Sequence, residues 1–255
     1  MNELLSAPLT PNLHNQILLE VCVTSLDFAL AAQRAGAGRI ELCTDLDCGG
    51  LTPTPRLMKA ARKQLQIPIH VLIRPRPGDF VYSASEFRTM RQAIQTAKDL
   101  NMDGIVVGIL DRNSHVDVAR TRQLVELAHP LPVTFHRAFD ETDISRNASR
   151  DSLEAVIETG AKRLLTSGGP AKATEGLSTL TRLVKEARGR LSVMPGGGIT
   201  PSNVTRVLSA TSAREVHGTL LTPPLRMKEH GADRNLQTVQ YYRRVRKAAL
   251  ILRRL

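Results

Sequence analysis

The chain of 255 residues contains no tryptophan, and aromatic residues make up only 3% of it. A hydrophobic core must therefore be built from leucine, valine, isoleucine and alanine. No apolar run approaches the roughly 20 residues that a membrane-spanning helix needs, so we expect no membrane partner. Three cysteines, with no secretory signal before them, favour a reduced cytoplasmic compartment and argue against a disulfide-stapled fold.

Positive charge exceeds negative charge by 11, and the excess is unevenly placed. Residues 234–255 contain seven basic residues and no acidic one. Val245, Ala248, Ala249 and Leu252 recur there at helical spacing, which predicts a basic C-terminal helix with one docked face. The segment lacks interleaved aromatics and any recognisable nucleic-acid module, so the sequence argues against a nucleic-acid partner.

Strand and helix patterns alternate eight times after residues 1–16, which we expect to be a flexible N-terminal tail. The predicted strands are Leu18–Val23, Arg39–Leu42, Ile69–Ile73, Gly104–Ile109, Val133–His136, Arg163–Thr166, Leu191–Met194 and Glu215–His217. The predicted helices between them are Leu26–Ala35, Pro55–Lys63, Ala84–Leu100, Val118–Ala128, Ser152–Thr159, Gly176–Ala187 and Pro201–Ser209. This alternation predicts an α/β fold, a single-domain TIM (β/α)8 barrel over residues 17–255.

Capping residues support several of these boundaries. Ser25 and Asp117 are expected N-caps, and Pro55 and Pro201 suit the first turn of a helix. Gly36 follows a predicted helix and suits the left-handed conformation of a C-cap.

Three predicted strands place a carboxylate two residues before a cysteine or histidine. The pairs are Glu20 with Cys22, Glu41 with Cys43, and Glu215 with His217. Residues two apart on a strand share a face, and closure of a barrel would make these three strands neighbours. A buried carboxylate is costly unless it is paired or binds a ligand, so the pattern predicts a functional barrel interior.

The cysteines Cys22 and Cys43 allow two interpretations. Each suits the role of a small buried apolar residue. Two thiolates in phase on adjacent strands also suit a soft ion such as Cu(I), and thiolate with imidazole suits zinc as well. The spacing is not a CxxC motif, so the metal interpretation depends on the fold.

Four titratable strand-end residues are candidates for acid–base catalysis: Glu20, Glu41, His136 and His217. Two carboxylates in one dry cavity would have at least one raised pKa, as proton transfer near neutral pH requires. The alternative is an ion pair between these glutamates and an interior arginine such as Arg74 or Arg137.

Two glycine-rich turns follow the sixth and seventh predicted strands and are candidate anion-binding sites. The first contains Thr166, Ser167 and Gly168, and the second contains Gly196, Gly197 and Gly198 and leads into a helix. Free backbone N–H groups attract phosphate or carboxylate, although such turns also serve simple loop closure. Arg74, Arg76 and Arg137 are expected to contribute to anion binding, with Arg74 and Arg76 on the same anion.

These segments together resemble the CutC family. The matching pieces include Leu19–Val23, Arg39–Cys43, Gly49–Pro53, Ile73–Arg76, Gly78–Phe80, Val133–Asp140, Leu165–Gly168, Pro195–Gly198 and Glu215–His217. The resemblance implies a cytoplasmic TIM barrel that forms a homo-oligomer, a dimer or tetramer. It also implies a role in copper homeostasis, with Cys22 and Cys43 as Cu(I) ligands. Pro77 replaces a usual glycine, Gly218–Leu221 replaces small residues, and the C-terminal segment is shorter and more basic.

Two hypotheses therefore stand side by side. The first is a copper-binding protein of copper homeostasis. The second is a barrel enzyme that acts on a small anionic or phosphorylated substrate, because a metal carrier needs neither the arginines nor the glycine-rich turns. A basic binding module is the weakest alternative.

Overall fold

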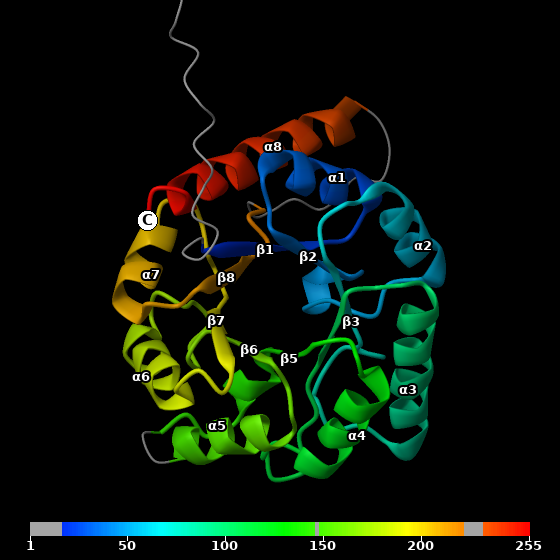
Figure 1. Ribbon diagram of the computed structural model, residues 1–255, viewed down its shortest axis with the longest axis vertical. Helices are drawn as coiled ribbons and strands as arrows, with labels where there is room; N and C mark the ends of the chain where they lie inside the picture. The colour runs from blue at the N-terminus through cyan, green and yellow to red at the C-terminus, as the bar shows by residue number, and fades with distance from the viewer. Residues whose placement is uncertain (1–16, 146–147, 222–231) are drawn as a thin grey trace, which may run out of the picture.

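The computed structural model describes residues 17–145, 148–221 and 232–255, so the predicted tail of residues 1–16 lies outside the described residues. Eight parallel strands surround a central axis and are covered by helices on the outside (Figure 1). The strands are β1 (Leu18–Val23), β2 (Arg39–Leu42), β3 (Ile69–Leu72), β4 (Gly104–Val107), β5 (Val133–Phe135), β6 (Arg163–Thr166), β7 (Ser192–Pro195) and β8 (Glu215–Gly218). The predicted TIM barrel is confirmed.

The sheet is a nearly closed barrel whose ladder runs β7-β6-β5-β4-β3-β2-β1-β8. Strand β1 lies between β2 and β8, so Glu20 has Arg39 opposite it on one side and His217 on the other. No ladder joins β7 to β8 in the part of the chain that the structure describes. A side-chain hydrogen bond of 2.8 Å from Ser192 Oγ to Glu215 Oε1 crosses this seam instead.

The helices that cover the barrel are α1 (Leu26–Ala35), α2 (Pro55–Gln64), α3 (Ala84–Asp99), α4 (Val118–Ala128), α5 (Ala148–Glu158), α6 (Leu177–Ala187), α7 (Val204–Thr211) and α8 (Ala232–Leu252). Two short 3-10 helices, Leu46–Cys48 and Arg137–Glu141, follow β2 and β5. The predicted caps are confirmed at three helix ends: Ser25 and Asp117 accept from the backbone at N3, and Gly36 has φ of 97°.

Two predicted helix starts are wrong. Helix α7 begins at Val204 and not at Pro201, because residues 201–203 form a turn and Asn203 occupies the N-cap position. The second glycine-rich turn therefore does not lead directly into a helix. Helix α5 begins at Ala148, four residues before the predicted Ser152, so its first turn extends into a polar segment that has no apolar periodicity.

Helix α8 packs along α1 on the outside of the barrel, as predicted for the basic C-terminal segment (Figure 1). Its buried face includes Tyr241 and Val245, and the rings of Tyr241 and Phe28 of α1 meet edge to face with centroids 4.8 Å apart. Arg243 and Lys247 lie on the exposed face. Across the described residues, no helix is long and apolar enough to cross a bilayer.

Candidate functional site

A cavity of about 660 Å³ opens where the strands end at the C-terminal side of the barrel. TIM-barrel sites lie at this face, because the loops after the strands converge there. Six polar or charged residues singled out by the sequence line it: Cys22, Glu41, Arg74, His136, Arg137 and His217. They come from β1, β2 and β8 and from the residues that follow β3 and β5, so closure of the sheet brings together residues that are far apart in sequence.

A buried network of charged side chains lies deeper in the barrel than the cavity. Arg39 forms ion pairs with Glu20 and, at 2.5 Å, with Glu215, which also pairs with Arg163 at 2.6 Å. Both members of the first pair are almost fully buried. The expectation of an ion pair with an interior arginine is thus met at Glu20, but the partner is Arg39 and not Arg74 or Arg137. Arg39 points inward because it lies two residues before Glu41 on the same strand.

The His217 imidazole rests on the Glu20 carboxylate, with Nδ1 and Oε1 2.7 Å apart. Burial alone would raise the pKa of Glu20, but the hydrogen bond from His217 and the Arg39 charge outweigh it and hold that pKa well below its usual range. Glu20 is therefore ionised and does not line the cavity. A carboxylate at Nδ1 fixes the ring orientation and leaves Nε2 as the nitrogen free to bind a ligand.

The thiol of Cys22, the carboxylate of Glu41 and the imidazole of His217 converge at the cavity wall. Their ligand atoms lie within 4.8 Å of one another, and all three residues are buried. Glu41 Oε2 has no hydrogen-bond partner among the described residues. Burial raises the pKa of Glu41. Burial also lowers the pKa of His217, but the negative charges of Glu41 and Glu20 outweigh this effect, so the net shift of His217 is upward. Sulfur, nitrogen and oxygen donors of this kind form a set that transition metals accept.

Cys43 lies behind Cys22, away from this cluster. The two sulfur atoms are 3.2 Å apart, and the Cys43 thiol also donates to Val23 O at 3.6 Å. Two sulfurs bound tetrahedrally to one ion at about 2.3 Å would lie about 3.8 Å apart, so the pair is closer than a shared ion requires. The hydrogen bond with Cys43, together with burial, raises the pKa of the Cys22 thiol. Only Cys22 of this pair lines the cavity.

Two buried histidines lie over glycines, His70 over Gly104 of β4 and His136 over Gly108, the residue after β4. A Cβ atom on Gly104 would lie 2.4 Å from the His70 ring, and one on Gly108 would lie 2.4 Å from the His136 ring. Burial lowers the pKa of His70 to about 4, and burial with the Arg74 charge lowers that of His136 to about 3. Both rings are therefore neutral at pH 7.

Sequence reasoning missed His70, Arg39 and Arg163. The available signal is the two-residue period itself. His70 and Arg74 share a face of β3 and the residues that follow it, and Arg39 shares the face of Glu41.

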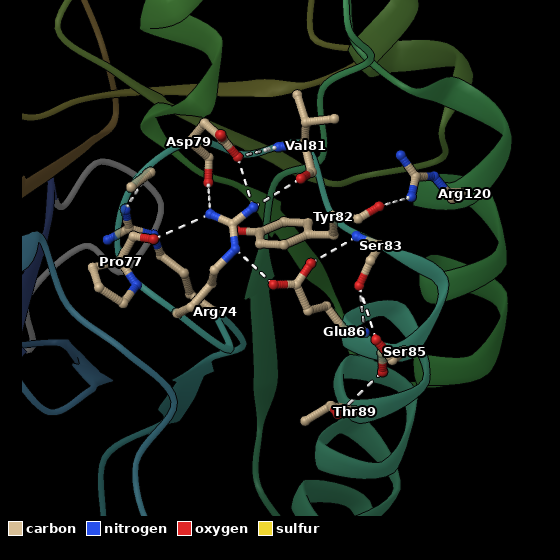
Figure 2. Close-up of polar contacts among 12 residues, drawn as sticks. Arg74, Pro77, Asp79, Val81, Tyr82, Ser83, Ser85, Glu86, Thr89 and Arg120 are labelled. Carbon is tan, nitrogen blue, oxygen red and sulfur yellow. Dashed lines mark hydrogen bonds and ion pairs between the residues drawn. The ribbon is translucent and has the colours of Figure 1, made fainter.

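The arginines Arg74 and Arg76 point in different directions, which contradicts the expectation that they hold one anion. Arg74 lines the cavity, and its guanidinium donates to the carbonyls of Cys48, Gly50 and Gly78. The guanidinium of Arg76 instead contacts Asp79, Glu86 and the Val81 carbonyl, and none of these residues lines the cavity. Figure 2 shows Asp79, Val81 and Glu86 before and at the start of α3. Arg76 forms ion pairs with two carboxylates, those of Asp79 and Glu86. The capping box of α3 fixes the position of Glu86.

The first glycine-rich turn already holds an anion, the carboxylate of Asp140. This carboxylate accepts from the Ser167 and Gly169 N–H groups, from both hydroxyls of Thr166 and Ser167, and from Arg137 Nε at 2.7 Å. These N–H groups are thus not free for a ligand, and Thr166, Ser167 and Gly168 do not line the cavity. The sequence placed the anion-binding turn correctly but not its occupant, because Asp140 comes from the loop after β5.

The second glycine-rich turn keeps its N–H groups open. Gly197 and Gly198 line the cavity, and their amides have no hydrogen-bond partner in the described parts of the chain. Gly196 lies beneath them, where its N–H donates to Thr166 O and a Cβ would lie 2.4 Å from Leu165. Gly197 packs against Arg137, since its Cβ would lie 3.4 Å from Cζ.

The comparisons with known proteins agree with the matched motifs. The CutC family model matches residues 17–222. A CutC family protein of Chromobacterium violaceum is 43% identical over 93% of this chain and 96% of its own length. The mouse protein named "Copper homeostasis protein cutC homolog" is 46% identical over 80% of this chain and 73% of its own.

Solved structures show the same architecture. The putative copper homeostasis protein CutC of Streptococcus agalactiae is 34% identical, with a TM-score of 0.76, and the match covers 81% of this chain and 100% of that one. The tryptophan synthase α subunit of Legionella pneumophila, at 13% identity and a TM-score of 0.63 over 94% of each chain, shares the fold alone. With a family model that spans most of its length and relatives above 40% identity, this chain belongs to the CutC family.

Proposed function

We propose that this CutC family protein binds copper as Cu(I) and acts in copper homeostasis. The observation that carries the proposal is the cluster of Cys22, Glu41 and His217, with His217 held by Glu20 behind it. A ligating histidine commonly donates its second N–H to a carboxylate, which orients the ring and strengthens it as a ligand. The name of the mouse relative supports copper as the ion.

The Cys22 thiol is the ligand that selects a soft ion in this proposal. Cu(I) prefers thiolate and imidazole, whereas Glu41 would supply only a weak third contact. Metal binding displaces the thiol proton, so the raised pKa of Cys22 makes the affinity depend on pH. Cys43 is the alternative second ligand, but its sulfur is 3.2 Å from that of Cys22, so the two sulfurs would have to move apart to share one ion.

A Cu(I) titration of the reduced protein against a competing chromophoric chelator tests the proposal. We expect Cys22→Ser to weaken Cu(I) binding at least 100-fold and His217→Gln to weaken it by a similar factor. Cys48→Ser serves as a thiol control, because the Cys48 thiol donates to Asp45 O outside the cluster. Wild-type affinity in Cys22→Ser would refute the proposal. Loss in Cys43→Ser without loss in His217→Gln would move the site to the thiol pair.

A second proposal is that the barrel is an enzyme in which Glu41, His136 and His217 handle protons. The cavity volume of about 660 Å³ supports this proposal, because it lies in the range of small-molecule sites and is far larger than the volume of one metal ion. The pKa values of Glu41 and His217 are both raised above their usual values. These shifts favour proton exchange between the two groups near neutral pH. Histidine NMR would test the pair: the His217 pKa should lie above 6.5 and fall in Glu41→Gln, and a pKa unmoved by that change would contradict it.

A homo-oligomer in a reducing, cytoplasmic compartment is part of the first proposal. The exposed apolar side chains of Leu236, Val239 and Leu250 on α8 support a subunit contact at this helix. Light scattering should give the mass of a dimer or tetramer, and Val239→Lys should lower it. A monomeric wild-type protein would contradict this part of the proposal.

A further inference from the structure

The cavity contains a buried positive charge that no carboxylate balances. Arg74 is 6% exposed, and no acidic side chain of the described residues lies within ion-pair distance of its guanidinium. Its N–H groups donate to three backbone carbonyls, and its Cζ atom lies 5.0 Å from the centre of the Phe80 ring. The other two arginines inside the barrel in the described part of the chain, Arg39 and Arg163, each have a glutamate partner. A buried charge without a counter-ion is costly, so this position favours an anion.

A free hydrogen-bond donor lies on the same wall. His136 is 6% exposed and lines the cavity, and its Nδ1 accepts from the Ala138 N–H at 3.1 Å. Since the ring is neutral, its one proton is on Nε2. This Nε2 atom is buried and has no partner among the residues described. The Phe80 ring contacts both residues: its centre is 5.0 Å from Arg74 Cζ and 5.0 Å from the centre of the imidazole.

The opposite rim of the cavity offers a second set of donors. The N–H groups of Gly197 and Gly198 have no partner among the residues with described positions, and neither has Arg137 Nη1. The Nε and Nη2 atoms of Arg137 bind Asp140 and Ser167. Successive glycines with φ of 98° and 64° leave the backbone accessible to an oxygen ligand. Glu141 also lines the cavity and opposes a highly charged ligand.

We propose that the cavity binds a small organic anion, a carboxylate or a phosphate ester, with its charged group beside Arg74 and an oxygen on His136 Nε2. The far end of the ligand reaches the N–H groups of Gly197 and Gly198. This small organic anion would be the substrate of the proposed enzyme, so its role as a substrate rests on the enzyme proposal. It is separate from the copper proposal, because Arg74 and His136 lie on the β3–β5 wall and the Cys22 cluster on the β8–β2 wall.

Calorimetric titration of the metal-free protein, kept in a chelator, tests this binding. The probes are glycolate, glycerol 3-phosphate and uncharged glycerol. We expect saturable binding of at least one anion and none of glycerol, and the stronger anion identifies carboxylate or phosphate. Arg74→Met and His136→Phe should each weaken that binding about tenfold or more, as loss of a hydrogen bond to a charged group does.

Arg120→Met is the matched control. Like Arg74, Arg120 donates to a backbone carbonyl and lies over an aromatic ring, although it also pairs with Asp117. It does not line the cavity, so its replacement should leave the affinity unchanged. Circular dichroism checks that each variant is folded, and His136→Phe decides the case if Arg74→Met unfolds. Failure of both anions to bind, or wild-type affinity in folded His136→Phe, overturns the inference. Binding of an anion while the Glu41–His217 pair fails its NMR test overturns the enzyme proposal alone.

Discussion

Glu20 Oε1 and His217 Nδ1 lie 2.7 Å apart between neighbouring strands that are 197 residues apart in the sequence. The contact joins the buried ion pairs below the cavity to the ligand cluster above them. Glu20 holds Arg39 with one oxygen and His217 with the other, so one carboxylate orients both residues.

Replacement of Glu20 should therefore cost stability as well as site geometry. Glu20→Gln keeps the shape but leaves Arg39 with Glu215 as its remaining carboxylate and His217 with none at Nδ1. Loss of one partner of a buried pair costs up to about 3–5 kcal/mol. Urea unfolding at pH 7 measures this loss. Glu158→Gln is the control, because Glu158 is 65% exposed in its pair with Arg122 and should lose less than about 1 kcal/mol. Equal losses in both variants would contradict the assignment.

The free energy of unfolding should fall as pH drops from 6.5 to 5. His70 and His136 have folded pKa values of about 4 and about 3, below the unfolded value of 6.5. Their stabilising contribution is complete above pH 6.5 and is lost as pH falls toward the folded pKa, by up to about 1.4 kcal/mol per pH unit for each ring. His217, whose pKa is raised, acts in the opposite direction and loses its contribution as pH rises through its folded pKa.

Removal of one ring isolates its share of this slope. In His136→Phe, the change of unfolding free energy between pH 6.5 and 5 should shrink by about 1 kcal/mol per pH unit. An unchanged slope in His136→Phe would show that His136 titrates normally in the folded protein.

The fit between Gly104 and His70 predicts a rescue. Gly104→Ala would place its Cβ 2.4 Å from the His70 ring, and such overpacking costs about 1–3 kcal/mol. In the His70→Ala background the ring is gone, so the added methyl group should cost little or fill part of the space. A double-mutant cycle by urea unfolding measures the coupling, and additive losses would rule out the contact as the cause.

Asp140 predicts an anion site that appears when its carboxylate is removed. Asp140→Ala leaves the Ser167 and Gly169 N–H groups without their acceptor and should lose about 3 kcal/mol. Acetate should then raise the melting temperature of the variant more than that of the wild type at equal ionic strength. Asp111→Ala is the control, since Asp111 accepts two N–H groups in an open loop and is 41% exposed. An equal acetate response in wild type and both variants would contradict this account.

The barrel is predictable from the amino-acid sequence, because each strand–helix unit carries a local signal. The apolar strands, the N-caps at Ser25 and Asp117 and the C-cap at Gly36 are all local features of the sequence. Eight consecutive strand–helix units leave few ways to arrange a parallel sheet. The two-residue period likewise placed Cys22, Glu41 and His217 on inward faces before any contact was known.

Which of the inward side chains meet depends on the folded barrel and cannot be read from local sequence. Three contacts join residues from different strands or loops. Glu20 pairs with Arg39, Glu86 pairs with Arg76, and the Asp140 carboxylate binds the first glycine-rich turn. Ion pairs and hydrogen bonds act over a few ångströms, so strand register and loop conformation select the partner. The same residue types along the chain would also be compatible with other pairings. Among the described arginines inside the barrel, Arg74 is the one whose guanidinium has no carboxylate partner.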